Sequence, residues 1–295
     1  MKVINKRKIF FAVSGTLVLL SWIFIGVFGL QPGIDLAGGT EWRVELQEQA
    51  EPTEISRFIL QEYGIDATAS SLSDGDTIIR LPEISEERHQ EMKGGLLVEF
   101  GGLKEKSFNS VGPVIGQELR SKSMWAIFFV LLGISLFVAW AFRKVSKPIN
   151  SWKYGITTLI TLIHDVSIPT GVFAVLGYFL GVEVDTTIII ALLVVLGFSV
   201  NDTIVVFDRI RENLLINKGK NRPLREIINE SVNETLMRSI NTSLTLTLVL
   251  VFLLIMGPNT LFYFILTILV GTIVGTYSSI FLASPMLYSW GKRRE

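Results

Sequence analysis

Long apolar segments alternate with polar stretches along the whole chain. Six of these segments are apolar over roughly 20 residues, the length that spans the hydrocarbon core of a bilayer as an α-helix. They lie at 9–29, 123–142, 155–177, 186–207, 239–256 and 261–287. The pattern therefore predicts a polytopic α-helical membrane protein with six transmembrane helices.

The first apolar segment could also belong to a secretory signal peptide. Its apolar run is longer than the central region of such a peptide, and no clear pair of small residues marks a cleavage site after it. We therefore expect this segment to be retained as the first membrane helix.

The long polar stretch 31–122 has the pattern of a mixed α/β domain between helices 1 and 2. The expected elements are a strand at 40–47, a helix at 52–63, strands at 67–72 and 77–81 around a turn at 73–76, a helix at 84–100 capped by Ser85, and a strand at 104–111. The order β-α-β-β-α-β predicts the split βαβ, ferredoxin-like arrangement of an α+β domain. We see no metal-ligand spacing here, and we expect His89 to lie at a solvated surface.

These patterns divide the chain into three parts. Residues 1–30 form the N-terminus and first helix, 31–122 the polar domain, and 123–295 the remaining five helices. A charged connection at 208–237 joins the fourth and fifth spans. Within it, Pro223 precedes a segment with amphipathic helical spacing, which predicts a short helix lying along the membrane interface.

Composition supports membrane insertion and gives an orientation. Hydrophobic residues make up 49% of the chain and charged residues 18%, with a mean hydropathy of +0.48, which excludes an ordinary soluble protein. Lys and Arg residues gather before the first span, between the second and third, and at the C-terminus, and are absent from 181–185 and 257–260. The positive-inside rule then places both termini in the cytoplasm and 31–122 outside. The absence of cysteine excludes thiol chemistry.

Ionisable residues inside the apolar spans are the candidate functional residues. His164 and Asp165 lie about ten residues into the third span, and Asp202 lies in the inner half of the fourth. Charge in hydrocarbon is costly, so such residues face protein or water and often mark an ion pathway. Arg238 opens the fifth span, at a depth similar to that of Asp202, and we predict that these two residues pair.

Smaller polar residues accompany these charges. Ser199, Asn201 and Thr203 surround Asp202, while Asn241, Thr242 and Thr245 follow Arg238 on one helical stripe. Structural interpretations remain open: Arg238 could anchor the helix at the interface, the hydroxyls could join helices, and His164 could make a single structural hydrogen bond. The Gly271–Gly275 step predicts close helix packing in the last span.

The residues together resemble the SecF proteins of the SecD/SecF protein-export family, in the resistance-nodulation-division (RND) superfamily. The resemblance covers nearly the whole chain. Its motifs are Gly33-Ile-Asp35-Leu-Ala-Gly38-Gly39, 111–119, His164-Asp165, 197–203 running into 207–213, and 238–243. No single motif is specific, but the set is.

The resemblance implies a function that periodicity cannot give. It implies a partner of SecD, associated with the SecYEG channel in the bacterial inner membrane, that uses a proton or sodium gradient to draw preproteins outward after SecA has acted. It assigns the membrane acid to Asp202 and the membrane arginine to Arg238, and it implies no cofactor, no metal, no enzymatic activity and no nucleic acid partner. The chain carries one RND-like half, so the SecD half is expected on another polypeptide.

Two other classes of function compete with this interpretation. An RND-type exporter of solutes or lipids would use the same charges, but a domain of about 90 residues is small for a substrate pocket. An intramembrane protease would use two aspartates, but the usual sequence contexts of its catalytic residues are absent and Arg238 would hold a nearby carboxylate ionised.

Overall fold

The computed structural model describes residues 2–46, 50–71, 75–143, 149–219 and 221–291. These residues form two compact units. One unit contains residues 1–31 and 125–295 and is helical, and the other contains residues 32–124 and holds a small sheet.

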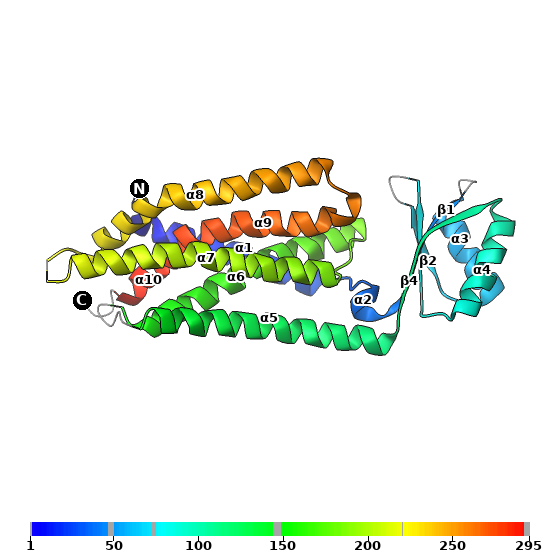
Figure 1. The fold of residues 1–295 in the computed structure, drawn as a ribbon, viewed down its shortest axis with the longest axis horizontal. Coiled ribbons are helices and arrows are strands. Elements are labelled where there is room, and N and C mark those ends of the chain that lie inside the picture. Colours follow the sequence, from blue (N-terminus) through cyan, green and yellow to red (C-terminus); the bar gives the residue numbers. More distant parts are fainter. Residues whose placement is uncertain (1, 47–49, 72–74, 144–148, 220, 292–295) are drawn as a thin grey trace. The chain divides into compact units, whose positions relative to one another are not determined.

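The described residues include the six long apolar helical segments that the sequence predicted, which makes the chain a polytopic helical membrane protein. A short 3-10 turn η1 (Val3–Lys6) leads into the first helix (Figure 1). The segments are α1 (Arg7–Phe28), α5 (Pro113–Ala141), α6 (Ser151–Leu180), α7 (Thr186–Ile216), α8 (Leu224–Met256) and a last span made of η2 (Asn259–Leu261), α9 (Phe262–Ser278), η3 (Ser279–Ala283) and α10 (Ser284–Gly291).

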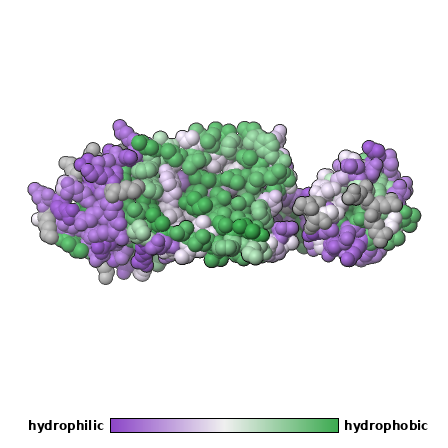
Figure 2. Space-filling model, turned by 90° about the horizontal axis from the view of Figure 1, so that it is seen from above, coloured by the Kyte–Doolittle hydropathy of each residue, from purple (hydrophilic) through white to green (hydrophobic). Residues whose placement is uncertain are grey.

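Burial divides these helices into two groups. About half of the most apolar stretch of α6, of α7 and of the last span is buried within the chain, whereas α1, α5 and α8 leave most of theirs exposed. The face of the helical unit in Figure 2 is hydrophobic over its middle and hydrophilic at the end where α7 joins α8. The exposed apolar surface is what a bilayer or partner helices would cover.

Close packing of α9 against α7 confirms the role predicted for the glycine step. A Cβ atom on Gly271 would lie 2.3 Å from Val195 Cγ2, and one on Gly275 would lie 2.9 Å from Ser199 Cβ. Neither position has room for a larger side chain, so the backbone of α9 packs directly against the side chains of Val195 and Ser199 on α7.

The connection between the fourth and fifth spans, predicted at 208–237, contains the helix expected after Pro223, but that helix runs on into the fifth span. Helix α7 continues to Ile216 and α8 begins at Leu224, so most of this segment is helical. Charge ends the apolar run, but it does not end the helix. Hydrogen bonds hold the two extensions together: Arg209 Nε donates to Glu234 at 2.7 Å, and Asn213 Nδ2 donates to Ser231 Oγ at 3.0 Å.

The described residues of the second unit form four strands and three helices. They are α2 (Ile34–Ala37), β1 (Gly39–Leu46), α3 (Pro52–Tyr63), β2 (Thr68–Ser71), β3 (Thr77–Leu81), α4 (Glu86–Glu99) and β4 (Leu103–Val111). The strands form an antiparallel sheet in the order β2-β3-β1-β4. Ser85 caps α4 as predicted, accepting a hydrogen bond from the Arg88 amide. Residues 72–74 of the predicted turn lie outside the described residues.

The core of this unit lies between one face of the sheet and helices α3 and α4. Strand residues Trp42 and Ile79 are fully buried against Ile55 of α3 and Met92 of α4. Trp42 pairs in register with Ile79 on β3 and with Phe108 on β4, so its indole lies at the centre of the sheet.

The prediction that His89 lies at a solvated surface is wrong. Its side chain is buried, and its ring stacks on that of Phe108 with 3.7 Å between centroids. His89 Nε2 lies 3.0 Å from Glu105 Oε2, which also accepts hydrogen bonds from Trp42 Nε1 and lies 3.2 Å from Lys93 Nζ. His89 shares the sheet-facing side of α4 with Met92, and its acidic partner comes from β4, which local sequence does not reveal.

Glu105 makes the stability of this unit depend on pH. Burial by itself raises the pKa of the Glu105 carboxyl, but Lys93 and His89 outweigh burial and hold the pKa below its ordinary value of 4.5. The unfolded chain therefore binds this proton more tightly, so Glu105 stabilises the fold at neutral pH and this contribution is lost as pH falls through the lowered pKa.

We expect Glu105→Gln to lower the free energy of unfolding of residues 32–124 by about 1–3 kcal/mol at pH 7, because three donors lose a charged acceptor. The loss should shrink as pH falls below about 4.5, where the unfolded chain takes up this proton, and should vanish as pH falls through the lowered pKa of folded Glu105. Hydrogen-exchange protection of the β1 amides measures this. The control is Glu91→Gln, because Glu91 forms an exposed pair with Arg88. Equal effects of the two substitutions at pH 7 would contradict the assignment.

Candidate functional site

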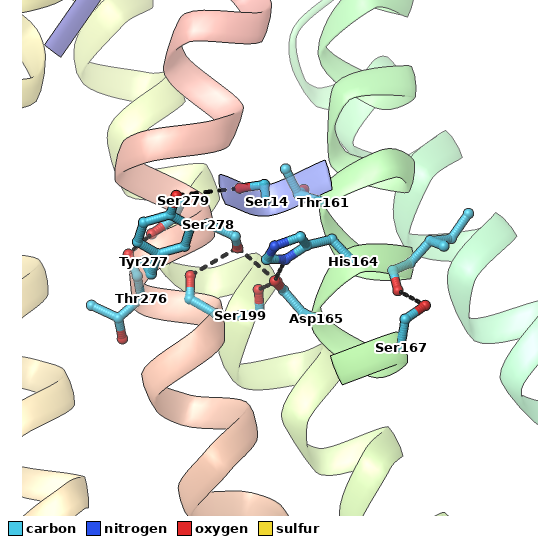
Figure 3. A network of polar contacts seen from close by, with 12 residues as sticks. Ser14, Thr161, His164, Asp165, Ser167, Ser199, Thr276, Tyr277, Ser278 and Ser279 are labelled. Atoms are coloured by element: carbon cyan, nitrogen blue, oxygen red, sulfur yellow. Dashed lines mark hydrogen bonds and ion pairs between the residues drawn. The ribbon is translucent and has the colours of Figure 1, made fainter. Parts of the chain in front are cut away.

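Asp165 lies at the centre of a polar network in the helical unit. Its side chain is fully buried on α6. His164 Nδ1 lies 2.8 Å from Asp165 Oδ1, while Oδ2 accepts hydrogen bonds from the Ser199 hydroxyl of α7 and, at 2.8 Å, from the Ser278 hydroxyl of α9 (Figure 3). Three helices thus supply donors to one carboxylate, which offsets the cost of burying it.

Asp202 on α7 is also buried, and its carboxylate is bound by Ser279, the residue that follows Ser278 in the last span. Ser279 Oγ donates to Asp202 Oδ2 at 3.2 Å. Successive residues of a helix point about 100° apart, so Ser278 and Ser279 reach acids on different helices. We call Asp165, Asp202, His164, Ser199, Ser278 and Ser279 the acid network.

The two serines lie where the last span changes its helical geometry. Helix α9 ends at Ser278, and η3 is a π-helical turn over Ser279–Ala283. Pro285 lies two residues after this turn and has no backbone N–H, and in a regular α-helix its ring would clash with the carbonyl of Phe281. A wider turn relieves that clash. Single π turns of this kind occur frequently at functional sites.

Neighbouring residues of the same segment contact two more helices. Tyr277 OH accepts a hydrogen bond from Ser14 Oγ of α1 at 3.3 Å, and Thr276 Oγ1 donates to Ser243 Oγ of α8 at 2.5 Å. Residues 276–279 therefore join α1, α6, α7 and α8. These residues were not predicted from the sequence, although four consecutive polar side chains within the apolar run 261–287 indicate a polar contact there.

Arg238 is exposed on α8 and lies apart from the acid network. Asn241, Thr242 and Thr245 share its exposed face. In the part of the chain that the structure describes, no ion pair joins Arg238 to Asp202, although Arg238 is close enough to act on that carboxylate electrostatically. The predicted direct pair is therefore not formed. Helical spacing gave the stripe correctly, but spacing does not reveal which side of a helix faces inward.

The other predicted supporting residues, on α7, differ in burial. Ser199 and Thr203 are buried, and the Thr203 hydroxyl has no hydrogen-bond partner among the described residues. Asn201 is exposed. Within those described ranges, no group of three or more His, Asp or Glu side chains is arranged to hold a metal ion.

The glycine motif lies in the other unit. Gly33 precedes α2, Asp35 lies within it, and Gly38 and Gly39 lead into β1. Gly38 has a φ of +80° and Gly39 a φ of +125°, values that other residues rarely adopt. A Cβ atom on Gly38 would lie 2.6 Å from Pro113 Cα, at the start of α5.

Comparison with known proteins identifies the family. The model of the C-terminal part of the protein-export membrane proteins SecD/SecF matches residues 96–293, and the SecD/SecF GG motif matches residues 23–50. The chain belongs to the SecD/SecF family. This membership gives it an accessory role in Sec-dependent protein translocation.

Individual SecF and SecDF proteins are similar over nearly the whole chain. The translocase subunit SecF of Thermobaculum terrenum is 40% identical, with 98% of this chain and 93% of that protein covered. SecF of Desulfurispirillum indicum is 39% identical, with 96% and 89% covered. The crystal structure of SecDF from Thermus thermophilus is 33% identical with a TM-score of 0.85, and the match covers 99% of this chain and 39% of that one.

Proposed function

We propose that this chain couples an ion gradient to the outward movement of preproteins, as the SecF half of a SecDF assembly. The observation that carries the proposal is the acid network. Two buried carboxylates on α6 and α7 are bound by adjacent serines, Ser278 at the end of α9 and Ser279 at the start of the π turn. Protonation of either acid would remove the charge that orders its serine, and the last span could then shift between two arrangements.

The available energy matches the size of such a change. One elementary charge that crosses 100 mV provides about 2.3 kcal/mol, and a pH gradient adds to this. Breaking or reforming a hydrogen bond to a charged group changes free energy by about 1.5–3 kcal/mol. Protons are the simpler coupling ion for carboxylates that already accept hydrogen bonds, and sodium is the alternative.

SecD is the proposed direct partner, and the exposed polar face of α8 supports this. A single-chain SecDF of Thermus thermophilus is 34% identical over 96% of this chain, which covers 38% of that protein. Arg238 and its polar neighbours would be costly in lipid, so a second half that carries polar groups at the same depth would complete the site. SecYEG and SecA would act with this assembly, which would be surrounded by membrane lipid.

We further propose that residues 31–122 lie outside the bacterial inner membrane, with both termini in the cytoplasm, and that this ferredoxin-like domain handles the translocating chain. The distribution of Lys and Arg supports the orientation. The antiparallel strand order β2-β3-β1-β4, with helices between β1 and β2 and between β3 and β4, supports the fold.

The orientation can be tested with single cysteines, because the chain has none of its own. Asn109 is exposed on β4, and Lys218 is exposed after α7. We expect Asn109→Cys to react with an impermeant thiol reagent in intact spheroplasts and Lys218→Cys to react only after lysis. The opposite labelling pattern would refute the topology.

The function is tested by export into inverted membrane vesicles. Vesicles with SecYEG, SecA and SecD, with or without this chain, are supplied with a preprotein and ATP, and a gradient is imposed or collapsed. We expect the gradient-dependent part of export to require the chain. Equal stimulation by the gradient in vesicles that lack the chain would exclude the coupling function.

A further inference from the structure

A cavity of about 680 Å³ lies in the helical unit between α1, α6 and the segment after α9. Its size is in the range of small-molecule sites. Most of its lining is apolar and includes Phe11, Val18, Ile160, Ile163, Leu282 and Met286. Leu19 and Trp22, which also line it, are exposed, so the cavity opens on the apolar outer surface of the helices.

Three polar side chains also line the cavity, and two of them are already bonded. Ser14 Oγ donates to Tyr277 OH at 3.3 Å, and Trp22 Nε1 donates to Ser167 Oγ at 3.2 Å. The third is His164, whose side chain is 3% exposed. Its Nε2 atom is buried and has no hydrogen-bond partner within the described ranges.

The hydrogen-bond partner of His164 Nδ1 determines whether Nε2 is a donor or an acceptor. When Asp165 is ionised, Nδ1 carries the hydrogen that it shares with Asp165 Oδ1. A neutral ring in this tautomer leaves Nε2 as an acceptor without a donor. Buried polar groups are normally paired, so the unpaired acceptor is a feature that requires a physical explanation.

We propose that this cavity is a binding site for a long apolar molecule with one hydrogen-bond donor at its end, such as a long-chain alcohol. The chain would fill the apolar lining, and its hydroxyl would donate to His164 Nε2. A hydrogen bond at Nε2 holds the other hydrogen on Nδ1, next to Asp165. The bound molecule would thus favour one state of the acid network, a consequence that rests on the proposed function, whereas binding itself does not.

Two photoreactive probes test the site in the purified full chain: hexadecanol with a mid-chain diazirine, and hexadecane with the same group. We expect the alcohol to label peptides of α1 and α6 at least five-fold more than the alkane, and unlabelled hexadecanol to compete. Titration of unlabelled hexadecanol should also shift the ¹⁵N resonance of His164 Nε2 in the wild-type chain.

Two glycines of α1 provide a matched pair of variants. A Cβ atom would meet nothing within 4 Å at Gly15 or at Gly26, but only Gly15 lines the cavity. We expect Gly15→Leu to fill the cavity and abolish labelling by the alcohol, and Gly26→Leu to leave it unchanged. His164→Phe should reduce labelling by the alcohol to the level of the alkane.

Three results would overturn the proposal. They are equal labelling by the alkane and the alcohol, unchanged labelling in Gly15→Leu, and an unshifted His164 Nε2 resonance at saturating hexadecanol. Specific binding without any effect on gradient-dependent export would leave the site in place and would remove only its link to the acid network.

Discussion

Replacing Asp202 with asparagine is expected to abolish the part of protein export that depends on the ion gradient. Asparagine has nearly the same shape and keeps an oxygen for Ser279, but it cannot exchange a proton or a charge. Asp165→Asn should have an equally large effect, because this acid is fully buried and receives hydrogen bonds from two serines. The resemblance assigned the membrane acid to Asp202, but Asp165 is the more deeply buried of the two.

Controls separate coupling from assembly. Asp208 lies on the same helix as Asp202 but is exposed and paired with Arg211, so Asp208→Asn should leave the stimulation unchanged. Arg238→Lys keeps a positive charge but loses the planar guanidinium, so it should reduce the stimulation without removing it. Export into inverted vesicles, with and without an imposed gradient, gives the measurement, and copurification with SecD verifies assembly. Full stimulation in Asp202→Asn would make this acid structural.

The second large effect is expected at Gly116, on the first turns of α5. A Cβ atom there would lie 2.6 Å from the backbone nitrogen of Gly38 and 3.1 Å from the carbonyl carbon of Ala37. Both neighbours are main chain, so neither can rotate away as a side chain would. We expect Gly116→Ala to lower the free energy of unfolding of residues 32–124 by about 1–3 kcal/mol, as overpacking does. Export should fall with it.

Gly133 on the same helix provides the control. A Cβ atom at Gly133 would meet nothing within 4 Å. Gly133→Ala should therefore be neutral or should stabilise the chain by up to about 1 kcal/mol, since alanine is the better helix former. Resistance of 32–124 to limited proteolysis at rising temperature compares the two variants. If both behave alike, the approach of Gly38 to Gly116 does not matter for stability.

The sequence predicted the membrane helices well because an apolar run of sufficient length is a local property. The two buried acids could be found in the same way, since an ionisable residue within such a run is conspicuous. Their partners could not. Ser278 lies 113 residues from Asp165 along the chain, and only the packing of α9 against α6 and α7 brings them together. A hydroxyl in a membrane span is common, so Ser278 alone gave no indication of its partner.

Arg238 and His89 show the complementary difficulty. Both were seen in the sequence, but His89 was expected at the surface and is buried, whereas Arg238 was expected to pair with Asp202 and is exposed. The spacing around Arg238 defined a helical face, but it could not show whether that face packs inside the helical unit or lies on its surface. The helix that carries His89 is polar along most of its length, and its burial depends on Glu105 and Phe108 of β4.

The π turn at Ser279–Ala283 also determines the rotational phase of the last span. One extra residue in a turn rotates everything that follows by about 100° relative to a continuous α-helix. Where the turn begins, Ser278 and Ser279 therefore face the acids, while downstream of the turn Leu287 and Tyr288 face the hydrophobic cluster that contains Ile4. A straight helix would place only one of these two sets correctly. Inserting or deleting a single residue within 279–283 would thus misalign one half of the span with respect to the other without altering any of the side chains that make these contacts.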